Sequence, residues 1–355
     1  MNYSSGLVLI ETPGNKSSLV FVSTVGVVSQ AVLDIVLLVN LDVLGELLGL
    51  AGIAANVIVI RVFVLEGFKD GVNISLVSLA LSDLGALITL QLYNVMVNPW
   101  LAEADLPFLP LEVQSLYAFY PHNYFSRVRG FVTAFVTLER CLCVAWPLKV
   151  KQVLTNRVSI ACNASIYLIM VLNVSPNYIM TYCEWKFVKS RNRTLYGILY
   201  RPNKDLVFSY TYFVTDFFIP FFAFFIVLFC TIVIVITLRS KALWRKSFST
   251  AGEATGKGIP GKERKVMLMI SAVSVIFIVC FIPFCAILTA RALVPGMGIN
   301  GTYWNLVLLV GSVAFFMETV NCSISIVVYF KMSSKFRARI LEMFTWVFGS
   351  LDEKC

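Results

Sequence analysis

Several charged side chains of this sequence lie inside long apolar stretches. Asp83, Arg127, Arg129, Asp216 and Glu318 are each well inside such a stretch. A charge in a low-dielectric interior is costly, so each of them should have a partner and is a candidate for a functional role. Arg127 and Arg129 are two positions apart, which places them about 200° apart around a helix. They are therefore expected to have different partners.

Residues for enzyme chemistry are scarce. His122 is the single histidine, and no metal-ligand spacing or nucleophile–base motif is apparent. We therefore expect no enzyme, no cofactor and no metal site. A lone histidine is often only satisfied by packing, so a ligand role for His122 stands beside that alternative. Eight of the nine cysteines fall in apolar runs, loop edges or the tail, where thiols stay reduced; Cys183 is the exception.

The composition points to a membrane protein. Of 355 residues, 58% are apolar and only 14% are charged, and a soluble domain has nearer a quarter charged. Too few charges remain to cover a water-facing globule, which excludes an ordinary cytosolic enzyme. The net charge of +9 would fit nucleic acid only on a water-facing fold with a basic patch. We expect the lipid bilayer as partner and no nucleic acid.

Seven apolar stretches are long enough to cross a bilayer as helices, which takes about 20 residues each. No internal repeat, soluble domain or cleavable leader is apparent. The sequence predicts an all-α membrane protein: a seven-transmembrane helix bundle (37–330) between an extracellular segment (1–36) and an amphipathic helix with a cytoplasmic tail (331–355). The predicted spans are 37–64, 72–97, 117–146, 157–180, 207–239, 263–292 and 303–330.

The run 19–36 is apolar enough to form an eighth span. Asp34, Asp42 and Glu46 lie in it or just after it, and no turn separates it from the first span. Buried carboxylates are costly, so a pre-membrane segment or an outward extension of the first helix is favoured.

The basic residues orient the bundle. With the N-terminus outside, 19 Lys and Arg lie in inner loops and tail and 8 lie outside. Triplets of the type Asn-x-Ser/Thr begin in segments placed outside, which makes these asparagines candidate glycosylation sites: Asn2, Asn15, Asn192 and Asn300. We expect a multi-pass protein of the plasma membrane.

Six motifs occur in order along the predicted spans. They are Gly52-x-x-x-Asn56, NISLVSLALSD ending at Asp83, Glu139-Arg140-Cys141 before AWPLK, Pro220, Cys280-Phe281-Ile282-Pro283, and NCSISIVVYFKMSSKFR with Tyr329. Over about residues 37–345 the chain resembles the rhodopsin-like (class A) G-protein-coupled receptors. The segments ERCLCVAWPLKV and VNCSISIVVYFKMSSKFR are most similar to molluscan chemosensory receptors.

The resemblance implies a receptor that couples an extracellular ligand to a heterotrimeric G protein. The implied switch is Arg140 with Glu139 and with Glu263 on the sixth span, together with Tyr329; an interfacial charge pair is the simpler alternative. A proline bend at Pro283 would let the inner half of that span swing. The implied ligand pocket comprises His122, Asn123, Ser126, Asp216, Phe281, Glu318 and Arg291.

The buried charges are expected to form two ion pairs. By position, Arg129 should face Asp83 and Arg127 should face Asp216, with Asn56 in the same network and Glu318 left over. In the family, the acid at Asp83 commonly helps to hold sodium, and Arg129 would supply that positive charge permanently. The alternative is that both pairs are only structural.

One departure from the family's pattern, a missing cysteine, and one further feature, an amphipathic segment, complete the sequence analysis of the chain. No cysteine precedes Cys141, so the usual disulfide from the outer third helix cannot form, and Cys183 is an unpaired thiol or pairs between chains. Residues 331–345 have apolar Phe336, Ile340, Leu341 and Phe344 at helical spacing, which predicts an interfacial amphipathic helix rather than a solvated tail.

The leading hypothesis is a G-protein-coupled receptor for a chemosensory cue. A neuropeptide receptor of the same fold is the alternative. A secondary transporter is a remote alternative from another class, because transporters typically have internal repeats and none is apparent in this sequence. Basic residues in the second outer loop and acidic ones in the first leave the charge of the ligand open.

Overall fold

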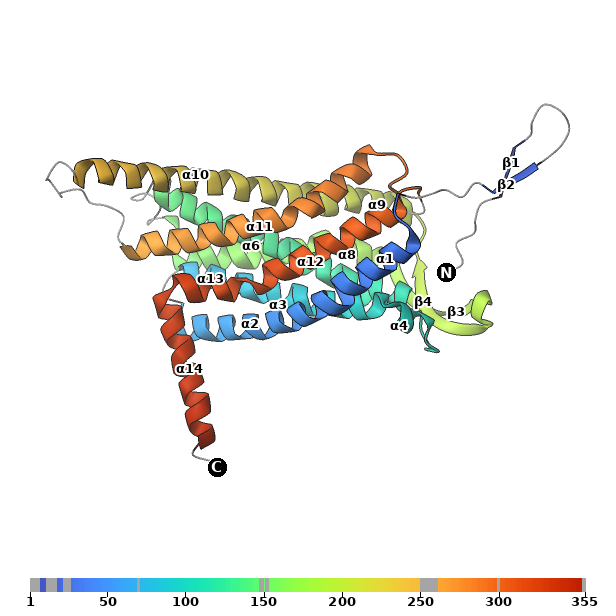
Figure 1. Ribbon diagram of the computed structural model, residues 1–355, viewed down its shortest axis with the longest axis horizontal. Helices are drawn as coiled ribbons and strands as arrows, with labels where there is room; N and C mark the ends of the chain where they lie inside the picture. The colour runs from blue at the N-terminus through green and yellow to red at the C-terminus, as the bar shows by residue number, and fades with distance from the viewer. Residues whose placement is uncertain are drawn as a thin grey trace.

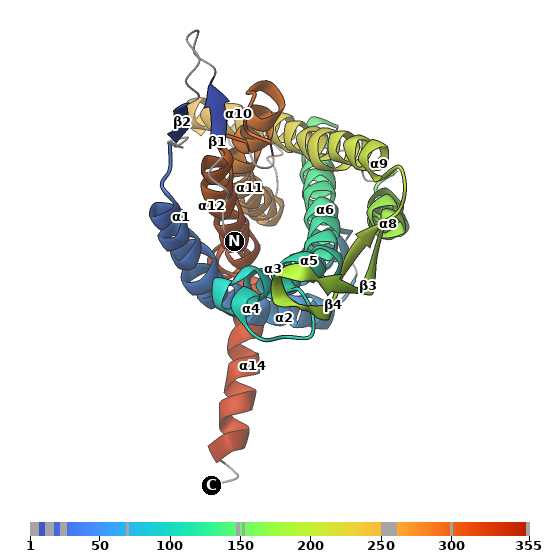
Figure 2. The ribbon, with the colours of Figure 1, turned by 90° about the vertical axis from the view of Figure 1, so that its right-hand side faces the viewer.

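The computed structural model describes residues 7–10, 18–21, 27–68, 71–146, 150, 153–249, 261–298 and 301–352. Long helices run side by side along the molecule, and α14 turns away from one end of the bundle (Figure 1). The opposite end, which carries strands β3 and β4, is the predicted outer end and faces the viewer in Figure 2. The helices of the bundle are α1–η1–α2 (Gln30–Glu66), α3 (Gly71–Val97), α6 (Tyr120–Ala145), α8 (Asn156–Met180), α10 (Ile219–Ser249), α11 (Gly261–Leu293), and α12 with α13 (Trp304–Ser323, Ser325–Met332).

Within the described chain, six of these helical stretches are long and apolar enough to cross a membrane. The remaining one, α6, has similar length but carries Arg127, Arg129, Glu139 and Arg140. It packs against α3, α8, α10 and α11, and its side chains Arg127, Arg129 and Glu139 are buried in the protein. The bundle thus has the all-helical, seven-span architecture that the sequence predicts.

The first helix begins at Gln30, ahead of the predicted boundary at residue 37. Strand β2 (Ser18–Phe21) pairs with β1 (Leu7–Ile10), so the described part of 19–36 is a strand end and an outward extension of the first helix. Among the described residues of this run, no separate spanning helix is present.

Three outer helix segments are wound as π-helix: η1 (Leu38–Gly45), η2 (Ser115–Phe119) and η4 (Tyr212–Phe218). Such widened turns present backbone carbonyls to neighbouring side chains and often occur at functional sites. In η1, the Leu41 carbonyl accepts from Asn94 at 3.3 Å and the Gly45 carbonyl accepts from Gln91 at 3.1 Å. Polar side chains of α3 thereby tie the first helix to the second span.

Short elements cover the outer end. They are α4 (Pro99–Glu103), α5 (Pro110–Gln114), the hairpin of β3 (Thr181–Val188) and β4 (Arg193–Tyr200) with the turn η3 (Lys189–Arg191), and α9 (Lys204–Thr211). The two strands are antiparallel and pair along their whole length, from Thr181 with Tyr200 to Val188 with Arg193.

Helix α14 (Ser334–Asp352) is the predicted amphipathic helix. Phe336 and Ile340 are buried, and the Phe336 ring packs on Phe63 and Tyr329 with centroids 5.4 and 5.7 Å away. Leu341 is exposed, as a lipid-facing side chain would be in this protein, and the side chain of Phe344 lies outside the described residues.

Candidate functional site: a charged cavity inside the bundle

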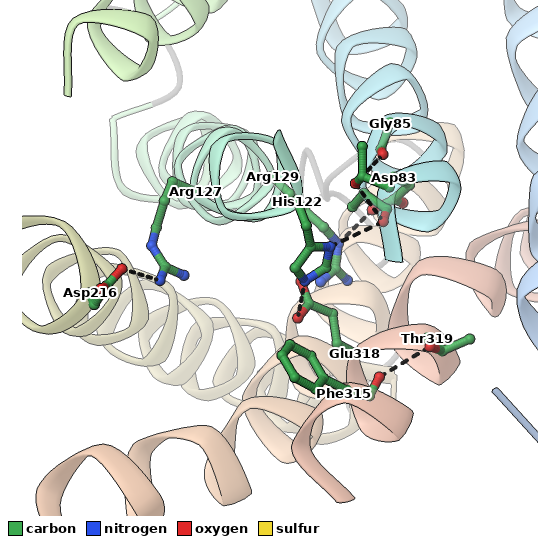
Figure 3. A network of polar contacts seen from close by, with 11 residues as sticks. Asp83, Gly85, His122, Arg127, Arg129, Asp216, Phe315, Glu318 and Thr319 are labelled. Carbon is green, nitrogen blue, oxygen red and sulfur yellow. Dashed lines mark hydrogen bonds and ion pairs between the residues drawn. The ribbon is translucent and has the colours of Figure 1, made fainter. Parts of the chain in front are cut away.

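Arg129 on α6 and Asp83 on α3 form a buried ion pair (Figure 3). The Arg129 Nε atom donates to Asp83 Oδ1 at 2.5 Å, and both residues are buried. The guanidinium carbon lies 5.7 Å from the centre of the Phe277 ring on α11, an additional cation–π contact. This is the first of the two pairs predicted from the sequence.

Arg127 forms the second predicted pair, on the other side of α6. Its Nη2 atom donates to Asp216 Oδ1 at 3.2 Å, and its Nε atom donates to the Thr215 carbonyl at 2.9 Å. Both acceptors belong to η4, and the Thr215 carbonyl is available because Pro220, five residues on, has no N–H to donate to it. The Arg127 side chain is 4% exposed and that of Asp216 is 27% exposed.

Glu318, which the sequence left without a partner, contacts His122. The two side chains approach to 3.3 Å between His122 Nε2 and Glu318 Oε2, while His122 Nδ1 lies 3.1 Å from the Ala86 carbonyl. The two histidine nitrogens thus face the backbone of α3 and the Glu318 carboxylate of α12, so His122 links α6 to both helices. His122 and Arg129 are seven residues apart, which is about two turns and one helix face, and this spacing could have revealed the contact.

A small, partly open cavity lies between these groups. Of the predicted pocket residues, Ser126, Phe281 and Glu318 line it, while His122 and Asp216 stand behind it as partners of Glu318 and Arg127. Asn123 is buried, and Arg291 lies over the Tyr212 ring at the outer end of α11. Sequence reasoning missed that both arginines, and the Phe277 and Phe284 rings, would line the cavity.

Asn56 links the first span to the seventh below this cavity. Its Nδ2 atom donates to the Gly52 carbonyl at 2.9 Å and to the Cys322 carbonyl at 3.0 Å. Cys322 lies next to Asp83, so Asn56 adjoins the Asp83–Arg129 pair through the α12 backbone.

At the inner end of α6, Glu139 is buried and accepts hydrogen bonds from Ser159 at 2.8 Å and from Ser75 at 3.4 Å. Arg140 is half-buried, and its Nε atom has no hydrogen-bond partner among the described residues. The side chain of Glu263, its predicted partner, lies outside the described residues. Tyr329 is buried against Phe63.

A hydrogen bond connects α6 directly to α11 near this inner end. The hydroxyls of Thr137 and Ser274 are 2.8 Å apart, and both are fully buried. Neither residue is charged or lies in one of the motifs, so the sequence does not predict this contact.

Comparison with known proteins decides what this bundle is. The profile of the seven-transmembrane receptors of the rhodopsin family matches residues 55–329. The chain belongs to the rhodopsin family of seven-transmembrane receptors. It is similar to the platelet-activating factor receptors of Mus musculus and Rattus norvegicus, at 25% identity to each, over 302 and 310 residues, with 82% of this chain and of each relative covered.

Membership in the rhodopsin family makes the protein a multi-pass membrane receptor that signals through G proteins, and not an enzyme. The likeness to molluscan chemosensory receptors is not part of what the comparisons show.

This rhodopsin-family receptor secures its outer hairpin by polar contacts. Glu112 on α5 accepts from Lys186 Nζ at 2.7 and 2.9 Å and from the Ile198 backbone N–H at 2.9 Å. Gly197 permits this approach, because a Cβ there would lie 2.6 Å from Glu112 Oε2. We call the contacts of Glu112 with Lys186 and Ile198 the hairpin clasp.

Further contacts extend the attachment along β4. The Leu109 N–H donates to the Tyr196 carbonyl and the Tyr196 N–H to the Pro107 carbonyl, both at 2.9 Å. Arg193 pairs with Asp105. Cys183 is a free, half-buried thiol on β3, and burial raises its pKa.

Proposed function

We propose that this receptor binds an extracellular ligand in the charged cavity and activates a G protein by movement of α11. The observation that carries the proposal is the composition of the cavity wall. Arg127 and Arg129 come from α6, Pro220 from α10, Phe281 from α11 and Glu318 from α12. A ligand there contacts four helices at once, so it can favour one packing of them over another, which is the requirement for a ligand-driven switch.

The inner half of α11 is the moving part in this proposal. Pro283 lies inside α11 and removes one backbone hydrogen bond, which provides a bend beside the cavity residues Phe281 and Phe284. The Thr137–Ser274 contact holds the same helix against α6 in the described state. We propose that Arg140 and Glu263 add a second restraint, and that outward movement opens a groove for a G-protein helix.

For the ligand, we propose a chemosensory cue. The support is the likeness of the segments around Arg140 and Tyr329 to molluscan chemosensory receptors. Platelet-activating factor is a second candidate, since the curated relatives are receptors for it. A neuropeptide is the third. The transporter alternative does not hold, because the chain belongs to a receptor family.

At the outer face we propose that Asn192 carries a glycan. It is exposed at the turn between β3 and β4, with Thr194 completing the acceptor triplet. Asn2, Asn15 and Asn300, proposed in the same role, lie outside the described residues.

The test is GTP exchange on heterotrimeric G proteins by the receptor in membranes. Platelet-activating factor, peptides and waterborne small molecules are the probes. Arg140→Ala should abolish stimulated exchange at matched surface expression, because Arg140 lies where the G protein would engage. Normal stimulated exchange by Arg140→Ala would overturn the switch, and surface labelling at wild-type density is the control for folding.

A further inference from the structure

The two arginines of the cavity have unused hydrogen-bond donors. A guanidinium carries five N–H groups. Among the described residues, Arg129 donates only through Nε to Asp83, and Arg127 only through Nε and Nη2 to Thr215 and Asp216. The nitrogens of Arg127 and Arg129 that lack a partner are not fully buried. Their N–H groups are therefore accessible to a ligand. Both side chains line the cavity, which therefore offers several donors to a ligand.

Acceptors are fewer in the same space. Glu318 Oε1 has no hydrogen-bond partner among the described residues, but it is fully buried and therefore closed to a ligand in this structure. Asp83 is committed to Arg129. A cationic ligand would thus meet two arginines without gaining this carboxylate oxygen, whereas an anionic ligand would gain several N–H groups.

Asp216 is positioned so that a ligand anion can replace it as the partner of Arg127. It is the more exposed partner of its pair, at 27% against 4% for Arg127. A second cation, Arg291 on α11, lies over the ring of Tyr212, about one turn before Asp216 in η4. If a ligand anion takes the place of Asp216 on Arg127, the charge around Arg127 is unchanged, and Asp216 keeps a cation nearby. Buried Arg127 is never left unpaired, which is the costly outcome.

The rest of the cavity is apolar and aromatic. The rings of Phe277, Phe281 and Phe284 follow one another along α11, with successive centroids 5.4 and 5.1 Å apart. Phe131 on α6 is part of the same wall. An apolar or aromatic ligand body would pack against these rings.

We infer that the ligand is a small amphiphile whose anionic oxygen group, a carboxylate or a phosphate, binds Arg127 in place of Asp216 while its apolar body packs on Phe277, Phe281 and Phe284. The inference rests on the proposed function to the extent that the cavity is the ligand site. It specifies the chemical class of the ligand and the arginine that binds the ligand's anionic group.

The experiment measures the unfolding temperature of the detergent-purified receptor with four probes of one shape. They are 3-phenylpropionate, 3-phenylpropyl phosphate, 3-phenylpropanol and 3-phenylpropylamine. At least one of the two anions should raise the unfolding temperature in a concentration-dependent way, and the alcohol and amine should not. Comparison of the two anions separates a carboxylate from a phosphate ligand.

Variants locate the effect at Arg127. Asp216→Asn removes the competing carboxylate charge, so the apparent Kd of the stabilising anion should fall about tenfold. Arg127→Gln should abolish the stabilisation. Because Arg127→Gln alone strands Asp216 and can misfold, the paired variant Arg127→Gln/Asp216→Asn removes both charges and should fold but not respond.

The inference is overturned if the amine or alcohol stabilises the receptor as strongly as the anions, if neither anion stabilises it, or if the paired variant responds like the wild type. These readouts need no G protein. A receptor that is stabilised by the anion but never drives GTP exchange would therefore refute the proposed signalling and leave the anion site standing.

Discussion

Arg129 Nε donates to Asp83 Oδ1 across 2.5 Å between two helices, with 6% of the arginine side chain and 1% of the aspartate side chain exposed. Removing one partner strands the other charge in a medium of low polarity, at a cost of roughly 3–5 kcal/mol. Arg129→Met and Asp83→Asn should each lower the unfolding temperature and surface expression. The double variant should recover part of the loss, and simple additivity of the two effects would contradict the pairing.

The same pair should make signalling insensitive to sodium. In relatives, the acid at this position commonly holds the ion; here Arg129 already supplies a positive charge that would repel it. Ligand affinity should be equal in sodium and in equimolar potassium, measured by competition binding. A steep fall in affinity with sodium alone would show that the ion still reaches Asp83.

The contact between Thr137 and Ser274 should restrain basal activity. Thr137→Val and Ser274→Ala each delete one hydroxyl and a hydrogen bond of about 1 kcal/mol, so basal GTP exchange should rise up to about fivefold. Glu263→Ala, which removes the proposed second restraint, should act in the same direction. Basal exchange that stays at the wild-type level at matched receptor density would show that these groups do not hold α11.

The hairpin clasp should contribute roughly 1–2 kcal/mol to closure of the outer hairpin. Glu112→Gln removes the carboxylate charge that Lys186 and the Ile198 N–H contact. Hydrogen exchange at Ile198 should accelerate about five- to thirtyfold, and high salt should mimic part of the effect in the wild type. Glu103→Gln on α4 also removes one negative charge at the outer end, so it is the matched control and should leave exchange at Ile198 unchanged.

Cys183 should be dispensable and slow to react. Its pKa is raised by burial, so less thiolate is present at neutral pH, and alkylation by iodoacetamide should be slow at pH 7.4 and speed up as the pH rises. Cys183→Ser should leave surface expression and ligand response intact. Loss of expression would reveal an essential partner, and a dimer on non-reducing gels that Cys183→Ser removes would identify one between chains.

Helical geometry explains what the sequence could predict of this site. The angle between Arg127 and Arg129 separates their partners, and both predicted ion pairs are present. The same geometry places His122 on the face of α6 that carries Arg129, and thus near Glu318. Because His122 belongs to no motif, the sequence alone did not assign it this partner.

Other features depend on contacts that no periodic pattern encodes. The hairpin clasp joins Glu112 to Lys186 across 74 positions that include the two long helices α6 and α8. At the π-helical turn that contains Asp216, the neighbouring Thr215 carbonyl accepts a hydrogen bond from Arg127 on α6. The first helix begins at Gln30, where the Ser29 side chain caps it by accepting from the Val32 N–H, and Asn305 donates to the Val28 carbonyl just ahead of it.

The charges of α6 also bear on how the receptor enters the membrane during synthesis. An arginine at the centre of an isolated spanning helix costs about 2.5–3.5 kcal/mol of insertion free energy, and α6 carries two. Helix α3 emerges first, so Asp83 is already in place to receive Arg129. Asp216 is made 89 residues after Arg127, so Arg127 must wait for it. Stable insertion of α6 therefore depends on a helix that has not yet left the ribosome.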